Sequence, residues 1–308
     1  LSITYVDATQ GWIPTIDEAV TDVPSKGNSE GIFAYGAPNG AVSISNLVSN
    51  AGVVGSDVTG VGTARQDLGA CEYGGDKGIF GFGSGYTAIT NLVSNSGVVA
   101  SDTSGVGTAR ASVRACGYGG DKGIFAYGWT GSAVSMSNLV SNSGVVATDT
   151  TGVGTARRLL GACEYGDDKG IFGYGFTLSV FSITNLVSNV GVVSTDVTGV
   201  GTARYFLAAC KYGYDKGIFG YGDNGSGAVS MSNLVSNAGV VATDVTGVGT
   251  ARYGPSACEY GNDKGIFGFG NDGGYVGMTN LVSNAGVIAT DVSAVGTGRL
   301  GSAACSFN

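Results

Sequence analysis

The chain has 308 residues, of which 57 are glycine and none is histidine, and its 15 basic and 23 acidic side chains leave a net charge of −8. This acidic balance disfavours a nucleic-acid groove, which needs basic side chains to neutralise phosphates. The absence of histidine disfavours catalytic triads and zinc hydrolases, because histidine is the usual general base near neutral pH and the commonest metal ligand. No apolar run approaches the roughly 18 residues of a membrane-spanning segment, so we expect no membrane span.

Residues 1–30 stand apart from the rest of the sequence and contain Trp12, Pro14 and Pro24. We interpret them as an extended N-terminal arm. The arm either lies over the following domain or serves as a docking segment that attaches the protein to a partner.

A repeat of about 47 residues fills positions 31–308. The segment Gly-Ile-Phe-(Gly/Ala)-(Tyr/Phe)-Gly occurs six times, with its phenylalanines at Phe33, Phe80, Phe125, Phe172, Phe219 and Phe267. One cysteine recurs at a similar spacing, at Cys71, Cys116, Cys163, Cys210, Cys258 and Cys305. In the third repeat we expect four short strands, over 115–118, 124–127, 134–140 and 145–149, separated by turns rich in Gly, Asp, Asn and Ser. No segment has a helical period.

Four strands in about 47 residues match the length of a β-propeller blade, which is about 40 to 50 residues. We therefore expect an all-β fold, a six-bladed β-propeller of four-stranded blades. The first repeat begins at a second strand near Gly31, and the chain ends on a first strand over 302–305. The C-terminal strand is therefore predicted to complete the first blade and close the ring, so that removal of the last eight residues would open it.

The pattern of a small-residue strand, a turn, Gly-Ile-Phe-Gly-Tyr-Gly, two further strands and a single Arg resembles the kelch-type blade. The kelch double glycine appears here as Tyr-Gly or Phe-Gly, and the Tyr and Trp of the later kelch strands are missing. The resemblance implies the blade but not the copper chemistry of kelch-domain oxidases, whose ligands include histidine.

The tandem Asn-Leu-Val-Ser-Asn and Gly-Val-Gly-Thr-Ala-Arg segments are similar to repeat proteins of marine tailed phages. The opening segment from Thr4 to Trp12 resembles parts of their tail and fibre proteins. This resemblance implies a virion or extracellular surface location, with other virion proteins as partners of residues 1–30. Reduced cysteines would fit assembly in the cytosol before that.

Two kinds of residue recur once in each repeat, and a third recurs in five of the six, with Ser29-Glu30 in its place in the first. We expect the cysteines to be reduced and to pack as small buried side chains, since equivalent positions in neighbouring blades lie beyond the roughly 7 Å between Cα atoms that a disulfide allows. A ring of thiolates around a soft metal is the alternative.

In every repeat an Asp precedes an Arg by eight residues, as Asp102 precedes Arg110. We expect such residues to hold the connection between blades through backbone carbonyls and a charged pair, with an anion site as the alternative. Asp-Lys pairs such as Asp76-Lys77 suit the first hairpin turn.

Two windows differ from repeat to repeat. One follows the second strand and the other follows the repeated Arg, and alternating strand directions place both on one face of the propeller, with the constant hairpins on the other. The variable face collects aromatic and short polar side chains that suit stacking on sugar rings or anchoring a protein. The candidate ligand-binding residues are Tyr86, Trp129, Phe176, Tyr205, Phe206, Asn224, Tyr253, Asp272 and Tyr275.

We therefore expect a non-catalytic, lectin-like recognition module that binds a surface glycan or protein through the variable face, without cofactor or metal. Three alternatives stay open. The aromatic residues pack under the loops and bind nothing; the protein is a structural spacer or decoration; or it is an enzyme that uses Tyr and Arg in the channel.

Overall fold

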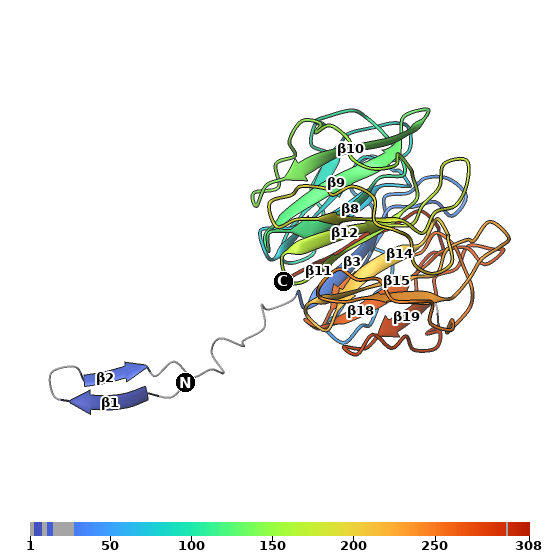
Figure 1. Cartoon of the computed structure of the whole chain (residues 1–308). Coiled ribbons are helices and arrows are strands. Elements are labelled where there is room, and N and C mark those ends of the chain that lie inside the picture. Colours follow the sequence, from blue (N-terminus) through green and yellow to red (C-terminus); the bar gives the residue numbers. More distant parts are fainter. Residues whose placement is uncertain (1–2, 8–10, 15–27, 294) are drawn as a thin grey trace.

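The computed structural model describes residues 3–7, 11–14, 28–293 and 295–308 (Figure 1). This part of the chain contains no helix, and none therefore that could cross a membrane. Strands β1 (Ile3–Asp7) and β2 (Gly11–Pro14) form an antiparallel hairpin within the expected N-terminal arm. The remainder of that arm before Asn28, at 1–2, 8–10 and 15–27, lies outside the described residues.

The other eighteen strands form six antiparallel sheets of three strands each, one per repeat. In order of their hydrogen bonding, the sheets are β20 (Ala303–Phe307), β3 (Glu30–Ala34) and β4 (Ser45–Val48); β5 (Gly69–Tyr73), β6 (Lys77–Gly81) and β7 (Thr90–Val93); β8 (Arg114–Tyr118), β9 (Lys122–Trp129) and β10 (Ala133–Val140); β11 (Gly161–Tyr165), β12 (Lys169–Gly173) and β13 (Thr184–Val187); β14 (Ala208–Tyr212), β15 (Lys216–Gly220) and β16 (Ser232–Val235); and β17 (Ser256–Tyr260), β18 (Lys264–Gly268) and β19 (Thr279–Val282). The all-β class and the propeller-like repetition of sheets agree with the prediction.

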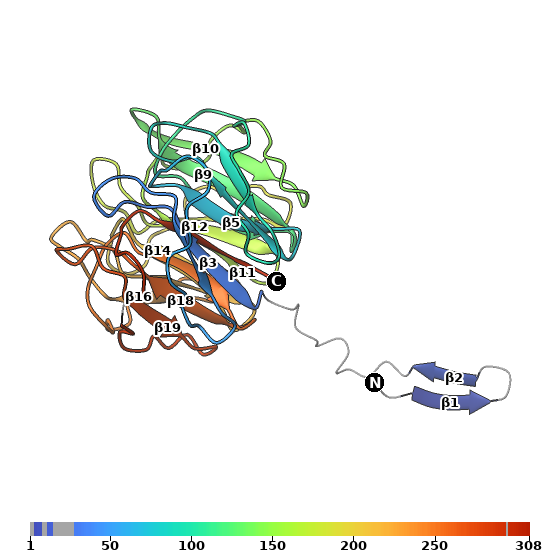
Figure 2. The ribbon, with the colours of Figure 1, turned by 180° about the vertical axis from the view of Figure 1, so that it is seen from behind.

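The first sheet contains both ends of the repeat region. Strand β20 pairs with β3, with Ala304 opposite Phe33 and Phe307 opposite Glu30. Figure 2 shows the C-terminus beside β3, as this pairing requires. The prediction that the C-terminal strand completes the first sheet is confirmed.

The expected fourth strand of each repeat is reduced to isolated bridges. In the first repeat Val54 bridges Val48 and Val58 bridges Ser45, without a continuous ladder between them. The Asn46 side chain explains the interruption, because its Nδ2 donates to the Gly55 carbonyl at 3.0 Å and to Asp57 Oδ1 at 2.9 Å. A side-chain amide thus donates to a carbonyl that would otherwise accept a backbone hydrogen bond from the neighbouring strand.

Apolar packing joins each sheet to the next. A buried aromatic ring at the end of a second strand meets the repeated Phe of the neighbouring sheet, with ring centroids 5.2 to 5.4 Å apart. The pairs are Tyr35–Phe80, Phe82–Phe125, Tyr127–Phe172, Tyr174–Phe219, Tyr221–Phe267 and Phe269–Phe33. Such tilted and edge-to-face contacts are favourable beyond the area they bury.

The repeated cysteine and the glycine of the second strand form a matched contact. A Cβ added to Gly123 would overlap the sulfur of Cys71 in the preceding sheet. All six cysteines are free and buried, and the same contact recurs between every pair of neighbouring sheets. The expectation of reduced, buried thiols is confirmed. The packing explains why cysteine and glycine recur with one period.

Each repeated Arg links two sheets, and Arg110 illustrates the arrangement. Its guanidinium donates to the carbonyls of Tyr127 and Thr108 and to Asn138 Oδ1, at 2.9, 3.0 and 2.7 Å, and lies 4.3 Å from the Phe82 ring centroid. The connecting role is confirmed. The acidic partner is not Asp102, eight residues earlier, but the Asp of the next sheet. That residue is Asp149, whose Oδ1 lies 3.9 Å from Arg110 Nη1 and whose carboxylate accepts bonds from Thr108 and Asn138.

Candidate functional site

The two variable windows of each repeat meet in the structure. The residue after the linking Arg pairs through its backbone with the residue that follows the second strand. The bridges are Ala111–Trp129, Arg158–Phe176, Tyr205–Asp223, Tyr253–Asn271 and Leu300–Ala37. In the second repeat Ser84 donates its N–H to the Gln66 carbonyl at 2.8 Å. The Gln66 N–H bonds instead to Ser84 Oγ at 3.0 Å, so this pair is not a full bridge. The backbone pairing thus recurs in all six repeats whereas the side chains differ, and we call the surface they form the variable face.

Four side chains from three successive repeats form a continuous stack on the variable face. The Arg158 guanidinium carbon lies 4.2 Å from the Trp129 ring centroid and 5.7 Å from that of Phe176. The Phe176 and Tyr205 centroids are 5.1 Å apart. All four side chains are half-buried. The structure thus brings two of the predicted ligand-binding residues, Trp129 and Phe176, to one cation and places a third, Tyr205, against Phe176.

A second aromatic pair joins the next two repeats. Phe206 and Tyr253, both half-buried, have centroids 5.9 Å apart. The Phe206 backbone has a φ of 54° and its carbonyl accepts the Gly254 N–H at 2.7 Å. Much of the aromatic surface in these two groups is therefore used in packing between repeats, in line with the alternative of packing under the loops.

The other predicted residues lie on separate loops. Tyr86 and Tyr275 are 51% and 43% exposed. Asn224 Oδ1 accepts the Ser226 N–H at 2.9 Å, and Asp272 Oδ1 accepts the Gly274 N–H at 3.2 Å. These two polar side chains thus stabilise their own turns, which leaves their remaining polar atoms to a ligand.

Arg158 and Leu178 were missed by the sequence analysis. Leu178 is 99% exposed at the tip of the loop that follows Phe176. Within the described residues, no carboxylate lies at ion-pair distance from Arg158 and no acceptor faces its buried Nε. The signal for Arg158 was present, because the position after the linking Arg reads Gln66, Ala111, Arg158, Tyr205, Tyr253 and Leu300, with one cation among them.

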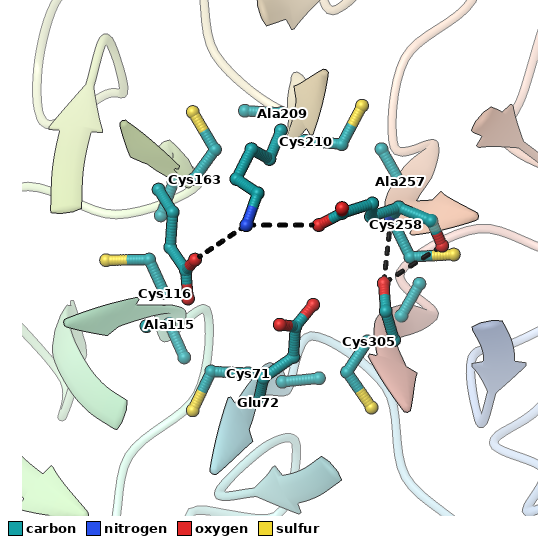
Figure 3. A pocket seen from close by; sticks show the side chains of 18 residues that line it. Cys71, Glu72, Ala115, Cys116, Cys163, Ala209, Cys210, Ala257, Cys258 and Cys305 are labelled. Carbon is teal, nitrogen blue, oxygen red and sulfur yellow. Dashed lines mark hydrogen bonds and ion pairs between the residues drawn. The ribbon is translucent and has the colours of Figure 1, made fainter. Parts of the chain in front are cut away.

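The sequence analysis also missed a group of charged residues in the central channel. The residues that follow the six cysteines are Glu72, Gly117, Glu164, Lys211, Glu259 and Ser306. Figure 3 shows Glu72 in the middle of the pocket that the first strands line, with the six sulfur atoms at its edge. The six thiols therefore lie at the periphery of the channel and do not point to its centre. Among the described residues, no group of three His, Cys, Asp or Glu side chains is placed to hold a metal ion.

A single ammonium group balances part of this cluster. Lys211 Nζ lies 3.5 Å from Glu164 Oε2 and 3.4 Å from Glu259 Oε2. Ser306 accepts the Glu259 N–H at 2.8 Å and donates its hydroxyl to the Glu259 carbonyl at 2.9 Å. A Cβ on Gly117 would overlap Glu164 Oε1, so the missing side chain leaves the room that this carboxylate uses.

Burial and mutual repulsion shift the pKa values in the channel. Burial, followed by the Glu164 charge, raises the pKa of Glu72 to about 7, while Lys211 opposes the shift. Burial also raises the pKa of Glu259 well above its usual range. Burial alone would lower the pKa of Lys211, but the neighbouring carboxylates outweigh it and raise that pKa. The cluster favours an additional proton over a full set of charges.

The hairpins at the opposite side are nearly uniform. Asn142 in the second turn of the third repeat donates to Asp121 Oδ2 in the first turn at 3.1 Å, and Asn237 and Asp215 repeat the contact at 3.0 Å. Each Asp also has its neighbouring Lys at ion-pair distance, as Asp121 has Lys122 at 2.8 Å. These contacts support a structural role for the Asp-Lys pairs.

No family model matches the chain, and no curated protein matches it.

Proposed function

We propose that the six sheets are the blades of a closed six-bladed propeller, the isolated bridges marking a rudimentary fourth strand in each. The six aromatic pairs support closure, because Phe269 of the last repeat meets Phe33 of the first. A second series of contacts follows the same cyclic order. In each, a backbone N–H at the first hairpin of one repeat donates to a backbone carbonyl at the first hairpin of the next, at 2.7 to 3.1 Å. The donor and acceptor pairs are Gly74–Asp121, Gly119–Asp168, Gly166–Asp215, Gly213–Asp263, Gly261–Ser29 and Asn308–Asp76.

Deletion of residues 302–308 tests closure. It removes β20 and leaves β3 with an unpaired edge, so the truncated chain should expand and aggregate on size-exclusion chromatography. A compact monomer with unchanged thermal stability would contradict a closed ring.

We propose that the protein is a non-catalytic recognition module that binds a cell-surface glycan or protein through the variable face. The observation that carries this proposal is the contrast between a backbone pairing that recurs, as a bridge in five repeats and as a single hydrogen bond in the sixth, and side chains that differ in all six pairs. A rigid backbone that presents different side chains limits the conformational entropy lost on binding. Exposed Tyr86, Tyr275 and Leu178 add apolar contact surface around the stacked residues.

The phage-like repeats support a virion or tail-fibre setting, with residues 1–30 binding other virion proteins. The channel, filled by paired and hydrogen-bonded side chains, offers little space to a substrate. That packing favours recognition over catalysis in the channel.

Binding of the labelled chain to a broad glycan array and to intact bacterial cells tests the proposal. Trp129→Ala and Tyr253→Ala each remove part of a different aromatic group, and Lys122→Gln alters the uniform hairpin side as a control. We expect binding to a defined glycan or cell type that weakens at least tenfold in the first two variants and persists in the control.

A structural role without a ligand is the second candidate, because the aromatic side chains of the variable face are half-buried against one another. Absence of binding by a folded chain would overturn the recognition proposal and favour an assembly role centred on residues 1–30.

A further inference from the structure

Arg158 differs from every other described arginine in the way its guanidinium is satisfied. The six linking arginines each donate hydrogen bonds to the protein and approach an Asp. Arg114 donates to the carbonyls of Leu160 and Val113 at 2.8 and 2.9 Å. Arg158, by contrast, has no hydrogen-bond acceptor and no ion-pair partner within the described part of the chain, and its Nε is buried.

Two aromatic rings contact the guanidinium of Arg158 and restrict its orientation. Trp129 and Phe176 contact the cation at 4.2 and 5.7 Å from their centroids. Stacking satisfies the faces of a guanidinium but none of its N–H groups, which lie in its plane. The N–H groups at the edge of the Arg158 guanidinium therefore have no protein acceptor and can donate hydrogen bonds to a ligand.

A carboxylate is the ligand that this edge fits best. Two parallel N–H donors of an arginine match the two oxygens of a carboxylate, and stacked arginines lose little freedom on forming such a pair. The acidic Asp223 and Asp272 on the same face disfavour a densely charged ligand and favour one with a single carboxylate near Arg158.

The backbone around Arg158 is fixed before any ligand binds. Arg158 and Phe176 exchange two backbone hydrogen bonds, at 3.0 and 2.9 Å. The adjoining Tyr205 ring offers a further surface to the apolar face of a sugar. A pyranose acid could therefore be held by its carboxylate at Arg158 and by ring stacking beside it.

We propose that Arg158 is the carboxylate-binding residue of the variable face and that the ligand is an acidic glycan containing a uronic or sialic acid. This inference rests on the proposed recognition function and specifies its ligand class.

The test compares matched ligands on the full-length chain. Oligosaccharides ending in glucuronic, galacturonic or sialic acid are titrated beside the same oligosaccharides with their carboxyl groups reduced to alcohols. We expect at least one acid to bind tenfold or more tightly than its reduced counterpart, and this preference to weaken as salt rises. Arg158→Gln should abolish the preference.

Two variants separate specific recognition from damage to the fold. Arg158→Lys keeps the charge but loses the planar fork, so it should retain only a small part of the preference. Lys122→Gln removes a cation from the hairpin side and should leave the preference unchanged. Circular dichroism melting of each variant shows whether the stack and the fold survive the substitution.

The outcomes distinguish this inference from the proposed function. Equal binding of acidic and reduced glycans that is lost in Trp129→Ala would overturn the role of Arg158 while leaving recognition in place. If Arg158→Gln still bound the acid more tightly than the reduced glycan, the role of Arg158 would likewise be overturned. Binding to acidic peptides but to no glycan would overturn the glycan assignment, and absence of all binding would overturn both proposals.

Discussion

Replacement of Glu72 by Gln is expected to stabilise the folded protein above pH 7. Glu72 lies in the channel with Glu164, and burial and the Glu164 charge raise its pKa from 4.5 to about 7, against opposing interactions with Lys211, Ser306 and Asn28. Between those two pH values the folded state binds more protons than the unfolded state. Stability should therefore fall as pH rises through this window.

The size of the effect follows from the pKa difference. A change from 4.5 to about 7 corresponds to about 3 kcal/mol as an upper bound, since each pKa unit is about 1.4 kcal/mol. Water that enters the channel screens part of the interaction, so we expect about 2 kcal/mol at pH 8. For a chain of this size, that gain raises the midpoint of thermal unfolding by about 3 °C.

Thermal unfolding followed by circular dichroism at pH 5, 6, 7 and 8 measures this difference. The difference in unfolding midpoint between Glu72→Gln and the wild type should grow as pH rises. The midpoint of the variant should still fall somewhat with pH because the pKa of Glu259 is also raised. Glu30→Gln, which changes a carboxyl in β3 away from the channel, serves as the control. Parallel pH profiles for Glu72→Gln and wild type, or a loss of stability in Glu72→Gln at pH 8, would refute the reasoning.

Three further predictions concern the packing between sheets. Arg110→Met removes two buried hydrogen bonds and one partly buried one, and it should lower the free energy of unfolding in urea by about 3 to 5 kcal/mol. A loss below about 1 kcal/mol would contradict the linking role. Gly117→Ala should cost about 1 to 3 kcal/mol in the same assay, because its Cβ overlaps the carboxylate of Glu164, which can move away only by giving up its ion pair with Lys211. Gly40→Ala, with open space around it, should stay within about 0.5 kcal/mol. The six native thiols are buried and their pKa values are raised by burial, so an aromatic disulfide reagent at pH 8 should label none in the folded protein and all six in denaturant.

The sequence was sufficient to predict the repeating sheets because each local signal agreed with the others. Turn residues, short apolar strands and a fixed period recur together in all six repeats, and the phase of the repeat predicts that β20 pairs with β3. The cysteine and glycine periods coincide for a reason that the sequence alone did not reveal. Only the structure shows that Cys71 packs onto Gly123 of the next sheet.

The acidic partner of each linking Arg could not be identified from spacing. Every Arg has one Asp eight residues before it and another in the following repeat, so Asp102 and Asp149 were equivalent candidates for Arg110 by periodicity alone. Contacts in space select Asp149. Likewise, four β-rich segments predicted four strands in each repeat. In the first repeat, however, the Asn46 side chain donates to the Gly55 carbonyl, and the hydrogen-bond ladder of the fourth strand is interrupted.

The candidate sites were predictable only in part. Comparison of the repeats identified Trp129, Phe176 and Tyr205 as variable aromatic residues, but not that Arg158 contacts the first two. Glu72, Glu164 and Lys211 are far apart in sequence and meet only because the first strands surround one channel. Alignment of the residues after the six cysteines would have shown charged residues inside buried strands, which is the signal for this cluster.

Blocking one face at a time tests most directly whether the variable face is the binding face. Tyr86→Cys and Lys77→Cys place a reactive thiol at opposite ends of the segment that contains β6, on side chains that are about half exposed, while the native thiols stay buried. Each variant is coupled to a large poly(ethylene glycol) maleimide. Its binding is then measured to the cells or glycans that the wild-type protein binds. We predict at least a tenfold loss for the modified Tyr86→Cys variant and less than a twofold change for modified Lys77→Cys; the reverse pattern would contradict recognition through the variable face.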